Sequence, residues 1–538
     1  MHCIADGSLA VRRWTRVLRT EVSDRPQAQG VRHVETRLSI NLDRVAKIAN
    51  AGALLALAGS GLLGYFVSFY FHFLTVFLLL LNALNFYWRH IQTTHTLLSN
   101  FGFMAQLRYV IESLGPEFRQ YLYSSDNEER PFSRNERTEV YRKAKGIDSS
   151  AAFGTQLDLE SGHQILLRHS FFPASTDELE SFRVSFGEER ELPTMHTIDR
   201  PVMISGMSFG ALGSHAVRAL ARGAKKSGIP MNTGEGGYPK YHLMEGADLI
   251  FQIGTAKFGV RHEDGRLDEP KLAELAAKDQ IVMVEIKLSQ GAKPGKGGLL
   301  PKEKLSEEIA ELRGVPMGQD VVSPPRHLEC VDEATTVAFI RRVQEVAGLP
   351  VGIKFCLGRD VELRGLVREM KRQGIFPDFM TVDGAEGGTG AAPRSFMDGL
   401  GLPLLEALAQ VQAVLQEENA RDRLKLVASG KLIDARRQLV AMSMGADACY
   451  TARGFMLALG CIQALQCNQN TCPVGITTHN RRLQHGLDIE AKSMRVANYV
   501  AGLCHNHREL LAATGKTSAS QLDRGNLFLP GMHRGAAP

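Results

Sequence analysis

The sequence predicts an α/β protein built on a TIM (β/α)8 barrel that follows a transmembrane helical hairpin. From residue 201 onward, short apolar runs alternate with helical stretches eight times over about 260 residues, which is the rhythm of such a barrel. Glycine-rich polar loops follow most of these runs. An uncharged stretch near the N-terminus indicates the hairpin. A doubly wound open sheet uses the same alternation and is the second choice of fold.

Composition restricts the classes of protein that the chain resembles. With 538 residues the chain is too long for one ordinary core, so more than one unit is expected. The net charge of +5 is small, and we find no zinc finger, basic stripe or RNP-type motif, so nucleic-acid binding is not indicated. Cysteines outside residues 461–472 are scattered, as in a reducing compartment, which predicts a cytosolic main body.

The N-terminal part of the sequence indicates a polar arm followed by two membrane spans. Residues 1–36 are polar and unpatterned, and we expect them to be disordered. Ile48 to Trp88 is a run of 41 residues without Asp, Glu, Lys or Arg, about twice the ~20 residues that cross a bilayer once. We therefore predict helices at about 48–64 and 71–88 within a hairpin segment, 37–99. Basic residues flank the run and place both ends in the cytoplasm: Arg37, Arg44, Lys47, Arg89 and Arg108. A buried hairpin in a soluble protein is the alternative.

The rest of the chain divides into three parts. Residues 100–200 are charged and without a period, which suggests a mixed segment packed on a larger domain. The barrel is predicted over 201–480, and a helical extension with a tail over 481–538. The eight predicted strands are Val202–Phe209, Pro230–Thr233, Leu249–Phe258, Ile281–Leu288, Val351–Phe355, Phe379–Asp383, Leu424–Ser429 and Ala448–Ala452.

Six loops at the predicted strand ends indicate a phosphorylated cofactor. They are 206–216 "GMSFGALGSHA", 232–237 "NTGEGG", 286–298 "IKLSQGAKPGKGG", 383–393 "DGAEGGTGAAP", 428–432 "ASGKL" and 451–455 "TARGF". Glycine lets backbone N–H groups approach anionic oxygens, and barrels commonly hold phosphate after strands seven and eight. Each loop alone is a weak signal, because glycines after strands are often only turn residues. No Walker loop is present and no GxGxxG follows a strand, so a dinucleotide is not indicated.

Three of the eight cysteines lie close together in the loop 460–475. Cys461, Cys467 and Cys472 have the spacing C-x5-C-x4-C, with Pro473 after the third, which is typical of iron–sulfur ligation. Zinc fits less well, because neither the spacing nor a nearby His matches the usual pairs. The other interpretation is that the three cysteines are buried core residues, but the polar residues 468–471 between them indicate a loop. Three thiols suit a three-iron cluster, since a four-iron cluster needs a fourth ligand.

Several of these motifs together resemble a known family. "GMSFGA", "NTGEGG", "QGAKPG", "SPP" at 323–325, "DGAEGGTGAAP" and the cysteine loop occur in the order found in the FMN-binding domain of glutamate synthase, over roughly residues 130 to 480. The resemblance implies a barrel that binds FMN beside a 3Fe–4S cluster, which relays electrons. It also implies hydride transfer from reduced FMN to 2-iminoglutarate, formed from 2-oxoglutarate and ammonia, giving L-glutamate. The form with a hairpin is similar to stand-alone bacterial relatives, which implies a cytoplasmic (inner) membrane anchor and a catalytic domain in the cytoplasm.

The resemblance also assigns roles to residues. Lys293 is similar to a lysine that faces 2-oxoglutarate, where an ammonium group can pair with a carboxylate or stabilise negative charge. Glu235 is similar to an acidic residue near the arrival point of ammonia, where it can bind ammonium or relay a proton. The alternatives are that Lys293 is a solvated loop lysine and that Glu235 is a surface turn residue. The implied metal ligands are the three loop cysteines, and the implied FMN contacts are Met207, Ser208, Lys354, Asp383, Gly387, Gly388, Ser429, Gly430, Arg453 and Gly454, with Ser429, Gly430 and Arg453 near the phosphate.

Two departures from the family pattern leave the reaction open. No amidotransferase domain precedes the barrel, so ammonia is expected free or from a partner. Leu299 stands where the family has a glutamine that touches 2-oxoglutarate, and the lost hydrogen bonds, about 1–3 kcal/mol if left unmade, allow a different substrate. Ferredoxin, a separate flavoprotein or quinone remain possible electron partners. Besides glutamate synthesis, a second hypothesis is a flavin and iron–sulfur dehydrogenase that oxidises an amino or hydroxy acid and reduces quinone. A third hypothesis is a non-catalytic flavin sensor or assembly factor.

Overall fold

The computed structural model describes residues 42–147, 150–160 and 164–529, so the predicted arm 1–36 lies outside the described residues. The chain forms two compact units that divide between Ser124 and Ser125. The segment 100–200 is therefore shared between the two units.

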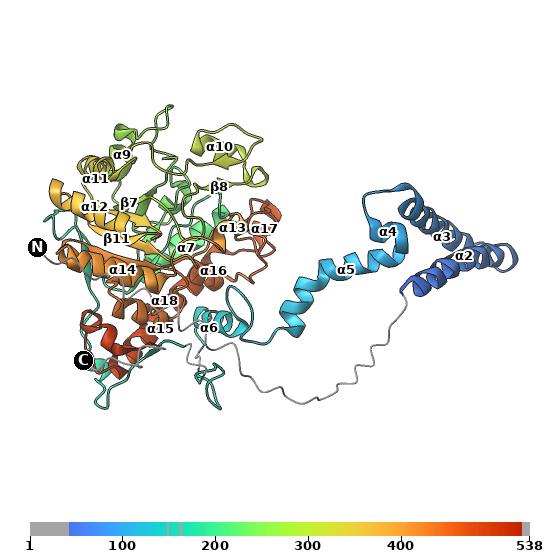
Figure 1. The fold of residues 1–538 in the computed structure, drawn as a ribbon, viewed down its shortest axis with the longest axis horizontal. Helices are drawn as coiled ribbons and strands as arrows, with labels where there is room; N and C mark the ends of the chain where they lie inside the picture. The colour runs from blue at the N-terminus through green and yellow to red at the C-terminus, as the bar shows by residue number, and fades with distance from the viewer. Residues whose placement is uncertain (1–41, 148–149, 161–163, 530–538) are drawn as a thin grey trace, which may run out of the picture. The chain divides into compact units, whose positions relative to one another are not determined.

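The first unit is a helical hairpin followed by shorter helices (Figure 1). Two long helices form the hairpin, and residues 45–66 and 71–91 are long and apolar enough to cross a membrane. The first helix begins six residues earlier than predicted, because Leu42 to Lys47 continue the helix although they include charges, which helices tolerate. The elements are α2 (Leu42–Phe66), α3 (Phe71–Phe86), η1 (Tyr87–Ile91), α4 (Thr96–Phe101), α5 (Phe103–Phe118) and η2 (Arg119–Tyr123).

The hairpin places its polar groups inside and its large apolar groups outside. Between the two helices, Asn85 Nδ2 donates to Asn50 Oδ1 at 2.8 Å and Thr75 Oγ1 donates to Ser60 Oγ at 3.1 Å. Leu55 is 73% exposed, and many other Leu and Phe side chains of α2 and α3 are also exposed. This arrangement is the reverse of a water-soluble helix pair, which buries its large apolar side chains.

The second unit contains the predicted barrel, with eight parallel strands that close on themselves. The pairing order is β10-β11-β12-β13-β4-β5-β6-β7, and β7 pairs back to β10. All eight predicted strands are present, so the barrel is confirmed and the open sheet is wrong. The strands are β4 (Val202–Ile204), β5 (Met231–Asn232), β6 (Leu249–Ile253), β7 (Ile281–Lys287), β10 (Val351–Phe355), β11 (Phe379–Asp383), β12 (Lys425–Ser429) and β13 (Ala448–Thr451).

Six of the strands are shorter than predicted, and two of them, β4 and β6, end five residues early. β4 ends at Ile204 rather than at 209, and β6 ends at Ile253 rather than at 258. In both places the apolar pattern continues, but the chain has already left the sheet to form a loop at the carboxyl end of the barrel. Burial without strand pairing therefore misled the prediction of these two boundaries.

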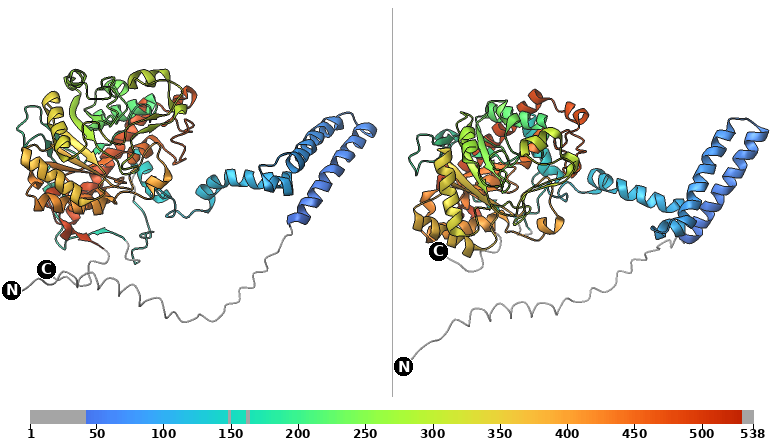
Figure 2. Two further views of the ribbon diagram at one scale, coloured as in Figure 1. Left: turned by 45° about the horizontal axis from the view of Figure 1, so that its top comes forward. Right: turned by 90° about the horizontal axis from the view of Figure 1, so that it is seen from above.

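Helices surround the barrel (Figure 2), and their apolar faces share one core with its strands. They are α7 (Ser214–Ser227), α9 (Glu269–Ala276), α11 (Glu333–Ala347), α12 (Asp360–Gln373), α14 (Leu404–Glu417), α15 (Ala435–Ser443) and α16 (Arg453–Leu459). Inside the barrel, Phe186 from the hairpin of β2 (Val184–Phe186) and β3 (His196–Ile198) packs on Phe379, with ring centroids 5.4 Å apart. Since Phe379 begins β11, this hairpin closes the amino end of the barrel and leaves the carboxyl end for ligands.

Further elements complete the unit. The long helix α18 (Ile489–Ala513) packs against α7 and α6 (Arg134–Ala144). The strand β1 (Leu166–Leu167) pairs with β14 (Leu527–Phe528), so the end of the chain is tied to the segment before the barrel. Smaller elements are β8 (Leu299–Leu300), which pairs with β9 (Val321–Val322), α8 (Lys240–Leu243), α10 (Glu307–Arg313), α13 (Arg394–Met397), α17 (Arg481–His485), and the 3-10 turns η3 (Thr176–Glu178), η4 (Lys302–Lys304), η5 (Arg421–Arg423), η6 (Ala519–Gln521) and η7 (Arg524–Asn526).

Candidate functional site

A cavity of about 670 Å³ lies at the carboxyl ends of the barrel strands. This volume is within the range of small-molecule and cofactor sites. The cavity brings together nearly all of the residues singled out from the sequence: Met207, Ser208, Glu235, Lys293, Lys354, Asp383, Gly387, Gly388, Ser429, Gly430, Arg453, Cys461, Cys467 and Cys472. Gly454 is not among the lining residues. It lies against the Tyr499 ring of α18, where any side chain would collide.

Glu235 forms the acidic centre of the cavity. Lys287, the last residue of β7, donates from Nζ to Glu235 Oε1 at 2.6 Å. Burial raises the pKa of Glu235, but Lys287, with smaller contributions from Lys293 and Arg313, outweighs burial and holds the pKa below its ordinary value. A Cβ on Gly298 would lie 2.7 Å from Glu235 Oε1, so a side chain at this position would displace the carboxylate. The loop therefore presents a fixed, ionised carboxylate rather than a surface turn residue.

Lys293 is a buried cation near this carboxylate. The residue is only 2% exposed, and its Nζ donates to the Ala391 carbonyl at 2.8 Å. Burial, and then repulsion from Lys287, lower the pKa of Lys293 to about 8. The interpretation of Lys293 as a solvated loop lysine is therefore wrong.

Arg313, at the end of α10, adds a second buried cation that the sequence reasoning missed. Its Nη2 lies 3.4 Å from the Phe209 carbonyl, and its Nε has no hydrogen-bond partner within the described part of the chain. Burial lowers its pKa to about 10, against the opposing attraction of Glu235. A guanidinium in this state is suited to an anionic ligand, because a buried charge is costly until it is paired.

Asp383 organises the opposite end of the cavity. Its Oδ1 accepts from Ser429 Oγ at 2.6 Å, and its Oδ2 accepts from the Gly291 N–H at 2.8 Å. Lys354 Nζ lies 3.8 Å from the same Oδ2. These contacts connect the ends of β10, β11 and β12, so each side chain is held at the mouth of the barrel.

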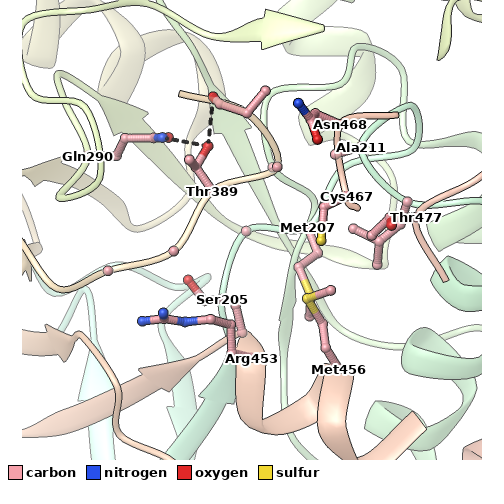
Figure 3. Close-up of a pocket in the computed structure, with 18 of the residues that line it drawn as sticks. Ser205, Met207, Ala211, Gln290, Thr389, Arg453, Met456, Cys467, Asn468 and Thr477 are labelled. Carbon is pink, nitrogen blue, oxygen red and sulfur yellow. Dashed lines mark hydrogen bonds between the residues drawn. The ribbon is translucent and has the colours of Figure 1, made fainter. Parts of the chain in front are cut away.

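Arg453 lies at the start of α16, and Figure 3 shows it on the cavity wall near Ser205. Its Nη2 donates to the Glu386 carbonyl at 2.6 Å, and burial lowers its pKa to about 10. A Cβ on Gly388 would lie 2.8 Å from Arg453 Cδ, so only glycine permits this close approach. The donor set at this end, with a buried guanidinium, a hydroxyl and glycine backbone, fits the phosphate of FMN.

The three loop cysteines line the other wall of the cavity. All three are free thiols, and Figure 3 shows Cys467 and Thr477 across the cavity from Gln290. Burial raises the pKa of Cys472, but hydrogen bonds from the Thr477, Val474 and Ile476 N–H groups outweigh it and lower the pKa overall. No three His, Cys, Asp or Glu side chains of the described residues are placed to hold a single metal ion. Cluster ligands bind separate irons and stand farther apart, so the thiol donor set fits an iron–sulfur cluster.

Lys304 ties the cysteine loop to the loop after β4, which carries Met207 and Ser208. The residue is 2% exposed, and its Nζ donates to the Ala211 carbonyl and, at 3.2 Å, to the Cys467 carbonyl. Burial lowers the pKa of Lys304 to about 8. No motif of the sequence indicates this contact, because it joins residues 163 positions apart.

Leu299, the residue that departs from the family pattern, also lines the cavity, from the short strand β8. Its side chain offers no hydrogen bond to a ligand. Leu299 therefore cannot make the hydrogen bonds that the glutamine of the family pattern would make at this position.

Comparison with known proteins shows the family to which this chain belongs. The family described as "Conserved region in glutamate synthase" matches residues 155–517. The glutamate synthase large subunit-like protein YerD of Bacillus subtilis is 38% identical over 466 residues, which cover 79% of this chain and 88% of that protein.

More distant similarities are also found. The archaeal glutamate synthase [NADPH] of Methanocaldococcus jannaschii is 36% identical over 61% of each chain. A mutant flavocytochrome b2 with pyruvate bound matches with a TM-score of 0.42 at 14% identity, covering 81% of this chain and 89% of that one. With the family match and YerD together, the chain belongs to the glutamate synthase family of oxidoreductases.

Proposed function

We propose that this protein is a membrane-anchored, glutamate synthase-like oxidoreductase that forms L-glutamate from 2-oxoglutarate and ammonia. The observation that carries the proposal is one cavity that holds an ionised carboxylate, buried cations and an end suited to phosphate. FMN, when bound and reduced, supplies the hydride that converts a 2-imino acid into an amino acid.

The cofactor contacts follow from the cavity wall. Ser429, Gly430 and Arg453 would hold the phosphate, because the buried guanidinium and the glycine backbone offer donors to its oxygens. Met207 and Ser208 would contact the rest of FMN from the loop after β4. Lys354 and Asp383, at the ends of β10 and β11, would orient the ring system. Gly388 leaves room for the Arg453 side chain, and Gly387 leaves room for the Gly384 carbonyl.

The substrate contacts use the buried charges. Lys293 and Arg313 would pair with the carboxylates of a 2-oxo acid, since both are buried and Arg313 has an unpaired Nε among the described residues. With a pKa of about 8, Lys293 Nζ can also give up or accept a proton near neutral pH. The ionised Glu235 would attract ammonium into the cavity, because Lys287 satisfies only one of its oxygens.

Cys461, Cys467 and Cys472 would hold a 3Fe–4S cluster that passes electrons to the flavin site. The thiols and the FMN contacts share one cavity, and backbone N–H groups already favour the thiolate at Cys472. Replacing Cys467 by Ser should remove the paramagnetic signal of an oxidised three-iron cluster, whereas Cys504→Ser, a free thiol outside the cavity wall, should keep it. An unchanged signal in Cys467→Ser contradicts the assignment. Reduced ferredoxin, a separate reduced flavoprotein or a quinol, the reduced form of quinone, would supply the electrons.

The hairpin of α2 and α3 would anchor the protein in the cytoplasmic membrane. Its outward apolar side chains and inward polar contacts suit lipid better than water. The positive residues that flank it would keep both ends, and the catalytic unit, in the cytoplasm. Membranes washed with alkaline carbonate should retain the protein, and its release would contradict the anchor.

The hairpin and Leu299 also favour a second candidate function. A dehydrogenase that oxidises an amino or hydroxy acid and reduces quinone would need a membrane location and a changed substrate pocket.

Steady-state turnover separates the two functions. Glutamate formation from 2-oxoglutarate and ammonium with a reduced donor supports the first, and quinone reduction by an amino or hydroxy acid without glutamate formation supports the second. Turnover in neither assay would favour the third hypothesis, in which the protein is a non-catalytic flavin sensor or assembly factor.

A further inference from the structure

The helix α5 carries an apolar face that is exposed within the N-terminal unit. Leu107, Val110, Ile111, Leu114 and Phe118 are between 44% and 56% exposed. Their spacing of three and four residues places them along one side of the helix. We call these five residues the α5 stripe. The opposite side is polar and includes Arg108, which pairs with Glu112 at 3.0 Å, and Ser113.

The start of α5 is fixed to the end of the hairpin. The Phe103 N–H donates to Asn85 Oδ1 at 2.8 Å, and the other end of the Asn85 amide donates to Asn50 Oδ1 at 2.8 Å. A Cβ on Gly102 would collide with the Asn85 amide, so the chain approaches α3 closely at this point. Figure 2 shows α5 leaving the hairpin at an angle to α2 and α3 rather than alongside them. The start of α5 therefore lies beside Asn85, in the last two turns of the second span.

We propose that α5 lies in the interface of the same membrane that the hairpin crosses, with its stripe in the acyl-chain boundary. The proposal rests on the membrane anchor proposed above. A helix fixed to the end of a span is held at headgroup depth, where an amphipathic helix buries its apolar face and keeps its polar face in water. Contiguous apolar surface is otherwise rare on a protein in water.

Apolar burial, not charge attraction, would hold α5 on the membrane. Residues 103–123 contain two basic residues, Arg108 and Arg119, and two acidic residues, Glu112 and Glu117, so their net charge is zero. Binding should therefore depend little on anionic lipid and survive high salt, since salt screens only the electrostatic part.

Tryptophan fluorescence in liposomes tests the proposal on the full chain. The chain contains only Trp14 and Trp88, so three single-tryptophan proteins can be made. Trp14→Phe keeps Trp88, in the turn that ends the second span, and reports on the hairpin. Trp14→Phe with Trp88→Phe and Phe118→Trp reports on the stripe. The same background with Ser113→Trp is the matched control on the polar face. Each is reconstituted in phosphatidylcholine vesicles with and without bromine on the upper acyl carbons.

We expect the brominated lipid to quench Trp88 and Phe118→Trp by about twofold and to leave Ser113→Trp nearly unchanged, also at 1 M salt. Quenching of Trp88 alone would overturn the proposal while the anchor stands, and would indicate that the barrel unit or a second copy covers the stripe. Equal quenching of both α5 positions would also overturn it, because the helix would then be immersed. No quenching at Trp88 would contradict the anchor itself and this inference with it.

Discussion

The two units of this protein differ in which side chains they bury and which they expose. The barrel unit buries charges such as Lys293 and Glu285, whereas the N-terminal unit exposes apolar side chains such as Leu55 and Phe77. Buried charges are tolerated where partners or ligands satisfy them, and exposed apolar groups are tolerated where lipid replaces water. The comparison teaches that the two units suit different surroundings, which under the proposed function are an anionic ligand for the first and a bilayer for the second.

The largest expected effect comes from removing a buried cation of the cavity. Lys293→Met should lower kcat/KM for the 2-oxo acid by about 10²–10³, because one stabilising donor at a reacting centre contributes about that much. Lys302→Met, an exposed lysine of the same segment, is the control and should have little effect. Comparable rates for the two variants would show that burial of Lys293 serves structure only.

A buried carboxyl group in the barrel interior should matter for stability. Glu285 is fully buried and accepts hydrogen bonds from Asn232, Gln252 and Thr381 at 2.7–2.8 Å. Glu285→Ala leaves these donors unpaired and should lower the free energy of unfolding by about 3 kcal/mol. Urea titration in detergent measures the change, with the exposed Glu274→Ala as a control near zero. Equal stability of both variants would mean that water replaces the carboxylate without loss.

The pH dependence of catalysis should follow Lys293. Its folded pKa of about 8 lies below the ordinary lysine value, so the ammonium form is lost as the pH rises through 8. The value of kcat/KM should then fall about tenfold per pH unit above 8. Lys293→Arg, which stays charged, should move this fall to higher pH. A flat profile up to pH 9.5 in the unaltered protein would contradict a cationic role.

The smallest effect concerns the junction of hairpin and α5. Asn85→Ala removes the acceptor of the Phe103 N–H and should speed hydrogen exchange of that amide about fivefold, equivalent to roughly 1 kcal/mol. Asn82→Ala is the control, since Asn82 donates mainly to the Leu78 carbonyl of its own helix. If both variants exchange alike, Asn85 does not fix the start of α5.

The barrel could be predicted from the sequence because its strands are short buried runs separated by amphipathic helices. The catalytic candidates were found because their loops carry unusual glycine patterns, as at Glu235. Lys287, Arg313 and Lys304 were missed, because a lysine or arginine at the end of a strand or helix looks like any solvated charge. Their burial depends on contacts between distant segments, which spacing does not reveal. The role proposed for Gly454 lacks support from the cavity wall, since packing against Tyr499 already requires glycine there.

Single-turnover reoxidation of the reduced protein tests the central claim most directly. The protein, purified anaerobically in detergent, is photoreduced and mixed with 2-oxoglutarate plus ammonium while flavin absorbance is followed. The account predicts flavin absorbance that recovers only when both substrates are present, with one glutamate formed for each flavin reoxidised. Absence of flavin, or reoxidation by quinone but not by these two substrates, would contradict it.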